Sequence, residues 1–459
     1  MREIKLLTVP QPEKDCASPV MLNDQTMEER KEKVLARMHE RNLDQLIIYG
    51  DVEHGSNFMY LTGYFTRFEE SLLVIQREGQ MTLVLGNESL NKAEKARMKA
   101  RGIHVPQFSL PNQPDKRKKT MKELLKEAGI GNGKRIGIVG WKNFASTIED
   151  GKKMFDLPEF IMTAIRSLVA KNAIITNETD LFIGENGIRT TNNANEIAHY
   201  EYGASLASDC VLDAMNQVTE GVSELKLGDC LMRNGQYTSV VTIAAAGERF
   251  VKGNMFPTTN TVKTGDSISL TVGYYGGLSS RTAMAVETEE DLPDGQKDYL
   301  EKVAVPYFKA YVSWLELVKI GMKGKEIFQM VDEVLPRDVY GWTLCPGHLT
   351  AEEEWMSSPI YEESEERLKS GMIFQIDIIP SIRGYVGVGA ESTVLLASDQ
   401  LKEELQKLYP EMFERMLKRK AYLEEVLGIR VSDDVLPMCS TVAYLRPYLL
   451  NHEKALVQV

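Results

Sequence analysis

The second half of the chain repeats one order of helices and strands, and this order restricts the fold more than any other feature of the sequence. Apolar side chains three and four residues apart predict pairs of helices, and short apolar runs predict strands. The expected order is two helices at 195–218 and 223–232, strands at 238–246, 267–273 and 282–286, two helices at 297–320 (with a bend at Pro306) and 325–335, and strands at 372–378 and 392–397. Two such halves folded over one sheet would place the polar residues of both in a shared central pocket.

The first half of the chain predicts a smaller mixed sheet with helices. The capping-box pattern Thr26-Met27-Glu28-Glu29 indicates the start of a helix. The elements expected after it are a strand at 45–50, a hairpin of 71–76 and 81–85, helices at 91–101 and 121–128, and a strand at 135–140. The two halves together predict an α+β protein with an N-terminal domain at 1–180 and a C-terminal domain at 181–459.

Composition argues against several classes of function. The net charge of −12 and the pI near 5.3 disfavour sequence-independent binding to nucleic acid, which needs a basic surface. Five cysteines, none in a CxxC pair, are typical of a protein in a reducing cytoplasm. The sequence has no apolar run of about 18 residues, the length that spans a bilayer. We therefore expect a cytoplasmic protein with neither a membrane anchor nor a nucleic-acid partner.

Two segments with motifs are expected to meet in the central pocket: GDSISLTVGYYGGLSSRT at 265–282, and the stretch 345–393 from CPGHLT to GVGAEST. Asp377 lies on the apolar strand MIFQIDII. Because an unpaired carboxylate is costly to bury, Asp377 needs an ion, a histidine or a ligand as its partner. The same reasoning applies to Glu391. His348 fits either a pocket residue with a chemical role or a hydrogen-bonded histidine of the core.

With these motifs the chain resembles the creatinase and Xaa-Pro aminopeptidase family, the pita-bread enzymes of peptidase clan M24. The matching segments are MYLTGYFTRFEESLLVI (59–75), NANEIAHYEYGASLASD (193–209), GDSISLTVGYYGG (265–277), CPGHLT (345–350), LKSGMIFQIDIIP (368–380) and GVGAESTVLL (387–396). They occur in the family's order, so the resemblance implies the pita-bread fold for the C-terminal domain and a creatinase-like N-terminal domain.

In the peptidase branch of this family, the resemblance implies a centre of two metal ions held by two aspartates, one histidine and two glutamates. His348 matches the histidine, Asp377 matches one glutamate with one methylene fewer, and Glu391 matches the other. The aspartates fall on Thr271 and, with the usual spacing, on Thr282, whereas a gap would put Ser280 there instead.

Charge then argues against a pair of ions. Two divalent ions bring four positive charges, and Asp377 and Glu391 balance two of them. The remaining imbalance of about two charges would cost several kcal/mol in a partly shielded site. We therefore expect no cofactor, while a single divalent ion held by His348, Asp377 and Glu391 stays an alternative.

Two further histidines of the family are replaced, at Asn254 and at Trp355. Asparagine forms hydrogen bonds but carries no titratable proton near neutral pH. In the creatinase branch the site needs no metal, and the segment Tyr64-Phe65-Thr66-Arg67 resembles one whose Phe and Arg reach the pocket of a partner subunit. By this resemblance Phe65 and Arg67 are substrate-binding residues in a homodimer, and Arg67 would bind a substrate carboxylate. An aromatic residue of the core and a surface arginine are the simpler alternatives.

The sequence thus predicts a hydrolase that cleaves a C–N bond in a small polar substrate, amidine or dipeptide-like, without a metal. The predicted catalytic residues are His348, Asp377 and Glu391, and the predicted substrate-binding residues are Phe65, Arg67, Asn254, Trp355, Thr271 and Thr282. Two alternatives remain: an Xaa-Pro aminopeptidase or dipeptidase with a residual metal site, and a non-catalytic domain that binds a peptide or protein.

Overall fold

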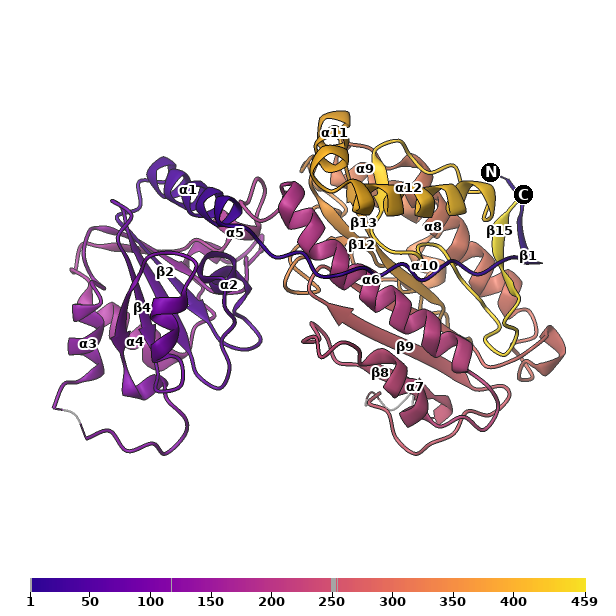
Figure 1. Ribbon diagram of the computed structural model, residues 1–459, viewed down its shortest axis with the longest axis horizontal. Coiled ribbons are helices and arrows are strands. Elements are labelled where there is room, and N and C mark those ends of the chain that lie inside the picture. The colour runs from indigo at the N-terminus through magenta and orange to yellow at the C-terminus, as the bar shows by residue number, and fades with distance from the viewer. Residues whose placement is uncertain (1, 117, 249–252, 254) are drawn as a thin grey trace. The chain divides into compact units, whose positions relative to one another are not determined.

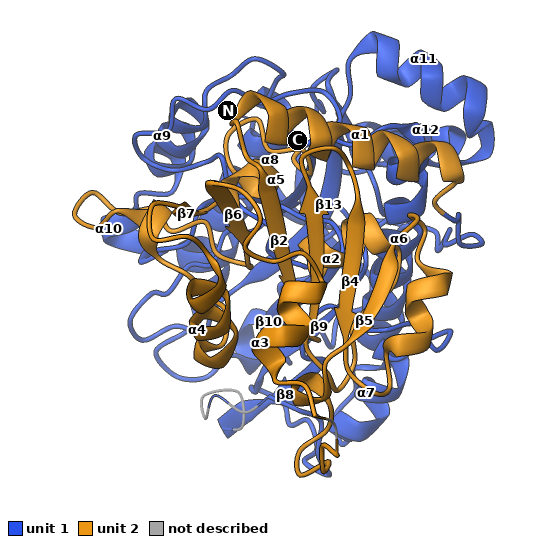
Figure 2. Ribbon diagram, turned by 90° about the vertical axis from the view of Figure 1, so that its left-hand side faces the viewer, with its two compact units in different colours: residues 1–21, 191–459 blue, residues 22–190 orange. Residues whose placement is uncertain are grey.

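The computed structural model describes residues 2–116, 118–248, 253 and 255–459. The chain forms two compact units, shown in different colours in Figure 2. Unit 2 comprises residues 22–190, and unit 1 comprises residues 1–21 together with 191–459. The compact units therefore divide at residues 21 and 190, whereas the sequence placed a domain boundary at residue 180.

Unit 2 is built around a six-stranded sheet of order β5-β4-β3-β2-β6-β7. Strands β2, β6 and β7 are parallel to one another, and β3 is antiparallel to both β2 and β4. The elements are α1 (Asp24–Glu40), β2 (Gln45–Gly50), α2 (Ser56–Thr62), β3 (Ser71–Gln76), β4 (Met81–Leu85), β5 (Arg101–His104), α3 (Met121–Glu127), β6 (Arg135–Val139), α4 (Glu159–Leu168), β7 (Ile174–Asn177) and α5 (Asp180–Ile183).

Two predictions for this unit are wrong in detail. Helix α1 is capped by Asn23, whose side chain accepts a hydrogen bond from the Thr26 amide, so the helix begins earlier than the pattern at Thr26 suggested. The helix expected at 91–101 is a 3₁₀ helix at Leu90–Lys95, followed by strand β5. Strand β5 pairs in parallel with β4. Pairing with the sheet thus outweighed the local helical preference.

Unit 1 contains a seven-stranded sheet of order β11-β12-β13-β10-β9-β8, with β14 paired to β13. Its elements, labelled in Figure 1 where there is room, are β1 (Ile4–Thr8), α6 (Ala194–Gln217), α7 (Glu224–Leu231), β8 (Ile243–Ala246), β9 (Ser267–Tyr274), β10 (Gly277–Met284), α8 (Val305–Leu317), α9 (Gly324–Val334), α10 (Arg337–Tyr340), β11 (His348–Leu349), β12 (Ile373–Ile376), β13 (Gly389–Leu396), α11 (Asp399–Leu408), α12 (Pro410–Glu425), β14 (Val435–Pro437) and β15 (Lys454–Gln458). None of the helices that the structure describes combines the length and apolar content that crossing a bilayer needs.

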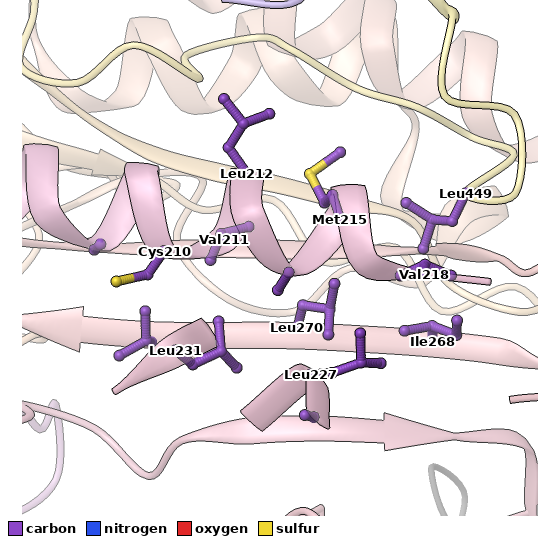
Figure 3. Packing of buried hydrophobic residues seen from close by; sticks show 14 of the residues in the cluster. Cys210, Val211, Leu212, Met215, Val218, Leu227, Leu231, Ile268, Leu270 and Leu449 are labelled. Atoms are coloured by element: carbon purple, nitrogen blue, oxygen red, sulfur yellow. The ribbon is translucent and has the colours of Figure 1, made fainter. Parts of the chain in front are cut away.

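The core of unit 1 lies where helix α6 packs against the sheet. Figure 3 shows apolar side chains from α6, α7 and β9 gathered there, among them Val211, Leu227 and Leu270. These three side chains are fully buried. Burial of each contributes about 1.5–3 kcal/mol relative to an exposed position, so this cluster holds β9 and its neighbours in place beneath α6.

A tight approach of helix to hairpin fixes the position of β9 and β10. Gly276 adopts φ +107°, and a Cβ atom there would lie 2.1 Å from the carbonyl oxygen of Tyr200 on α6. A side chain at Gly203 would meet the carbonyl oxygen of Tyr275 at 1.9 Å. Glycine is therefore required on both sides. The strand expected at 282–286 consequently begins at Gly277, directly after the turn.

The helix expected at 297–320 has a different form. A π-helical turn at Leu300–Ala304 leads into α8, and Pro306 stands in the first turn of α8, where its missing N–H is not needed. The predicted bend at Pro306 is thus replaced by a change of helix type just before it.

Candidate active site

Unit 1 contains a cavity of about 800 Å³ lined by both halves of the repeated pattern. The first half contributes strands β8, β9 and β10, and the second contributes β13 and the loop that precedes it. The polar lining comprises the hydroxyl-bearing residues Ser267, Ser269, Thr271, Ser280, Thr282, Ser381 and Tyr385, the amide Gln296 and the carboxylates Glu354, Asp377 and Glu391. The apolar lining includes Val240, Val241, Ile243, Leu344, Trp355, Ile379 and Val388.

Strand register brings the central residues of the cavity into one row. Ile243 of β8 lies opposite Thr271 of β9, Thr271 lies opposite Ser280 of β10, and Ser280 lies opposite Glu391 of β13. Asp377 follows β12 directly, one residue beyond the last pair of β12 with β13. The row therefore crosses the sheet from an apolar residue, through two hydroxyls, to two carboxylates.

The hydroxyl groups of this wall are bonded to one another. Thr271 Oγ1 and Ser280 Oγ share a hydrogen bond of 2.7 Å, and the Thr282 hydroxyl donates to Ser269 Oγ at 3.2 Å. Of the two positions that the sequence offered for the second aspartate, Ser280 faces Thr271, and Thr282 lies two pairs further along, opposite Ser269. Both positions line the cavity, and both carry neutral side chains.

His348 lies behind the cavity wall. Its side chain is fully buried and stacks on Trp355, with ring centroids 4.2 Å apart and planes 22° apart. The Nε2 atom lies 3.0 Å from Glu354 Oε1 and 3.9 Å from Asp377 Oδ2. The Glu354 carboxylate lies within ion-pair distance of Nε2, but its position relative to the ring does not meet the angle of a hydrogen bond from Nε2. Trp355 and Glu354 line the cavity on the side where His348 supports them.

Glu354 was missed by the sequence analysis. It is the third of three consecutive glutamates before Trp355. The run showed that the segment is acidic, but not which acid faces His348, because the segment has no regular periodicity and lies outside the helices and strands.

The charged groups of the cavity shift one another's ionisation. Burial raises the pKa of Asp377 to about 6, while His348 opposes the rise. Burial, together with the Asp377 and Glu354 carboxylates, raises the pKa of Glu391 well above its ordinary value. For His348 burial favours the neutral ring, but Glu354 and Asp377 outweigh burial and raise its pKa. The Asp377 Oδ1 atom is buried and has no hydrogen-bond partner within the part of the chain that the structure describes.

A buried arginine forms hydrogen bonds that join strands β10 and β13, which contribute residues to this row. Arg281 is fully buried and points away from the cavity. Its Nη1 donates to the carbonyl oxygens of Ser280 and Glu391 at 2.7 and 2.9 Å, and its Nε donates to the carbonyl oxygen of Tyr444 at 2.9 Å. Arg281 thus bonds to both residues of one opposed pair and holds β10 against β13.

The remaining predicted site residues are Phe65, Arg67 and Asn254. Phe65 and Arg67 belong to unit 2, where Phe65 is half-buried and Arg67 is exposed with its guanidinium 5.6 Å from the ring centre of Phe68. Their role in substrate binding stays a prediction. Asn254 lies outside the described residues.

The side chains at this site differ from the ligand set of the metal centre that the family resemblance implies. Within the described ranges, no group of three or more His, Cys, Asp or Glu side chains is arranged to hold a metal ion. Thr271 and Ser280 offer hydroxyls where the family offers carboxylates, and Nε2 of His348 faces Glu354. These residues do not fit a five-ligand centre.

Comparisons with known proteins agree on the fold. Residues 30–153 match the model of the creatinase/prolidase N-terminal domain, and residues 198–436 match the model of metallopeptidase family M24. No curated protein sequence matches the chain.

Similar solved structures are named as peptidases. A Xaa-Pro dipeptidase from Bacillus anthracis superposes with a TM-score of 0.61 at 16% identity, covering 82% of this chain and 96% of that one. A prolidase from Pyrococcus furiosus gives 0.60 at 20% identity, with coverage of 79% and 96%. An X-Pro aminopeptidase from Thermotoga maritima gives 0.61 at 16% identity, with coverage of 80% and 95%. Because the M24 match covers more than half of the 459 residues and follows a creatinase/prolidase N-terminal match, the chain belongs to metallopeptidase family M24.

Proposed function

We propose that this cavity hydrolyses a C–N bond in a small cationic substrate and does so without a pair of metal ions. One observation carries the proposal: the Oδ1 atom of Asp377 is buried and has no hydrogen-bond partner among the described residues. A buried carboxylate oxygen in that state is destabilising unless a donor reaches it. An amine or amidine N–H of a ligand is such a donor.

The charges at the site support independence from a metal pair. Thr271 and Ser280 are neutral, and Glu354 is already paired with His348. Asp377 and Glu391 then remain to balance four positive charges, and each is already hard to ionise because it is buried. Two of the four positive charges that a pair of divalent ions brings would therefore have no negative charge to balance them.

The different ionisation of Asp377 and Glu391 supports a division of roles. With a pKa of about 6, Asp377 is ionised near pH 7 and can accept a proton from an attacking water. Glu391, with its pKa well above the ordinary value, holds a proton that it can give to the leaving nitrogen. Oxygen from water joins the carbon, the C–N bond breaks, and the proton on Asp377 later returns to Glu391. His348 acts as a positioning residue, because it holds Glu354 and Trp355 at the cavity wall.

A second candidate is a Xaa-Pro dipeptidase or aminopeptidase with a residual metal site. The names of the similar solved structures favour it. One divalent ion at His348, Asp377 and Glu391 would require Glu354 to move away from His348 Nε2. Under either candidate function, we propose that the protein forms a homodimer and is located in the cytoplasm.

One experiment separates these candidates. The purified chain is assayed for its metal content, and then for release of amine from Xaa-Pro dipeptides and from small amidines, with and without chelator. The first proposal expects turnover that chelator leaves unchanged and that Asp377→Asn and Glu391→Gln each lower at least 100-fold. Exposed Asp294→Asn is the matched control. Activity lost with chelator and restored by a divalent ion supports the peptidase candidate, and ligand binding without turnover supports a non-catalytic domain.

A further inference from the structure

We infer that the ligand of this cavity joins a cationic end to an uncharged, apolar body, so that amphiphilic amines and carboxyl-blocked peptides fit better than zwitterions. This inference rests on the proposed function, because it concerns the same cavity. It narrows the substrate class from small polar molecules in general to cations whose other end carries no carboxylate.

The charged side chains among the described lining residues are all carboxylates: Glu354, Asp377 and Glu391. They gather at one side of the cavity, because Asp377 and Glu391 end the row on β12 and β13 and His348 ties Glu354 to Asp377. A cation placed there meets Asp377 Oδ1, which is buried and has no hydrogen-bond partner among the residues that the structure describes.

The other end of the same row is apolar. Ile243 of β8 lies opposite Thr271, and Val240 and Val241 precede it on the cavity wall. Val241 is 56% exposed, so apolar surface is open to a ligand at this end. Neighbouring strands lie about 4.8 Å apart, so three strand spacings separate β8 from β13 by about 14 Å. A hydrogen bond of about 3 Å at the acids and an apolar contact of about 4 Å at Ile243 take up half of this distance, so a ligand about 7 Å long, the length of an extended dipeptide, reaches from one end to the other.

The middle of the row suits an uncharged ligand body. The Thr271 and Ser280 hydroxyls are bonded to each other and can each still accept or donate a hydrogen bond to a neutral carbonyl or amide. A carboxylate on the far end of the ligand would instead lie against Ile243 and Val240, where it loses part of its hydration and meets no positively charged side chain among the described lining residues. Folded back, it would meet Asp377 and Glu391 and be repelled. Zwitterions of the creatine or free dipeptide kind are therefore poor matches.

Matched pairs of probes test this inference by calorimetry at pH 7.5 in the presence of chelator. The pairs are leucyl-prolinamide against leucyl-proline and benzamidine against 4-amidinobenzoate, which differ chiefly in the carboxylate. We expect the carboxylate-free member of each pair to bind at least tenfold more tightly. Ile243→Arg should reverse the preference by supplying a cation at the apolar end, while Ile243→Met should leave it unchanged.

The outcomes separate this inference from the proposed function. The inference is overturned if leucyl-proline and 4-amidinobenzoate bind as tightly as their carboxylate-free partners. If Asp377→Asn then lowers the affinity for every probe, the proposed cationic site still stands. If Asp377→Asn leaves all affinities unchanged, or if none of the four probes binds below millimolar concentration, the proposed cationic site fails and the inference fails with it. The affinity ratio within each pair of probes is measured on the wild-type chain. The inference therefore stays testable even if Ile243→Arg fails to fold.

Discussion

At the scale of single residues, the site contains carboxyl groups whose burial is energetically unfavourable. Asp377 is a buried carboxylate, one oxygen of which has no hydrogen-bond partner in the described part of the chain, and Glu391 is a second acid beside it. Functional sites often retain such destabilising groups because the ligand, rather than the protein, supplies the missing partner. The neutral hydroxyls at Thr271 and Ser280 add no further negative charge to this row.

Replacing Asp377 with asparagine should stabilise the chain at neutral pH. Because the folded-state pKa of about 6 lies above the ordinary value near 4, the folded chain binds this proton more tightly than the unfolded chain does. The ionised group therefore lowers stability above pH 6, and this penalty disappears as the pH falls toward 4. We expect Asp377→Asn to raise the free energy of unfolding by about 1–3 kcal/mol at pH 7.5. The gain should shrink by pH 4.5.

Urea unfolding at both pH values measures this difference. Asp294→Asn, at an exposed position, controls for the general effect of removing an acid and should change stability little at either pH. A less stable Asp377→Asn at pH 7.5 would mean that the carboxylate already has a partner in the free protein.

At the scale of elements, strand register decides which side chains meet. Alternation along 267–273 indicated a strand, but alternation alone does not tell which residue of the next strand lies opposite. The spacing usual in the family pointed to Thr282, whereas the tight turn at Gly276 places Ser280 opposite Thr271. The turn depends on the close approach of Tyr200 on α6, a contact between distant parts of the sequence that local patterns do not contain.

This register predicts that a metal centre can be rebuilt. Thr271→Asp combined with Ser280→Asp would place two carboxylates opposite each other and beside Glu391. Four carboxylates, counting Asp377, would then balance two divalent ions. We expect the double variant to bind Mn²⁺ or Co²⁺ at least tenfold more tightly than the unmodified chain and to be stabilised by the metal in thermal unfolding. The isosteric pair Thr271→Asn and Ser280→Asn should gain neither property, and equal metal binding by both pairs would refute the register argument.

The loop between Asp377 and Glu391 forms much of one cavity wall, and hydrogen bonds to several neighbouring segments hold it. The Tyr385 hydroxyl donates to Asp298 Oδ1 at 2.7 Å, and the Val386 amide donates to Gln296 Oε1 at 3.1 Å. Tyr385→Phe removes the first contact, so we expect amide hydrogen exchange in residues 384–388 to become roughly two- to tenfold faster. Tyr361→Phe, at an exposed tyrosine, should leave this exchange unchanged. Unchanged exchange in Tyr385→Phe would show that the other contacts hold the wall without the one to Asp298.

At the scale of the whole molecule, the fold class and family were predictable and several contacts were not. The α+β class and the M24 family follow from periodicity and motifs, and both are confirmed. Glu354 could not be chosen from its run of three acids, because its selection depends on the position of His348. Residues 1–21 carried no pattern that linked them to the C-terminal half. They nevertheless pack with unit 1, where β1 pairs with β15 at the other end of the chain.

A buried arginine fastens this N-terminal segment, and its removal gives the last prediction. Arg419 of α12 binds Asp15 through two contacts of 2.6 and 2.8 Å and Glu201 of α6 at 2.7 Å. Arg419→Met would remove the cation that binds Asp15 and would leave Glu201 with its ion pair to Arg415. Breaking a buried ion pair on one side costs about 3–5 kcal/mol. We expect a loss of that size in urea unfolding followed by tryptophan fluorescence. Lys418→Met, the neighbouring exposed cation, should change stability little. If the two variants lose the same stability, the N-terminal segment is held by β1 and β15 rather than by this charge cluster.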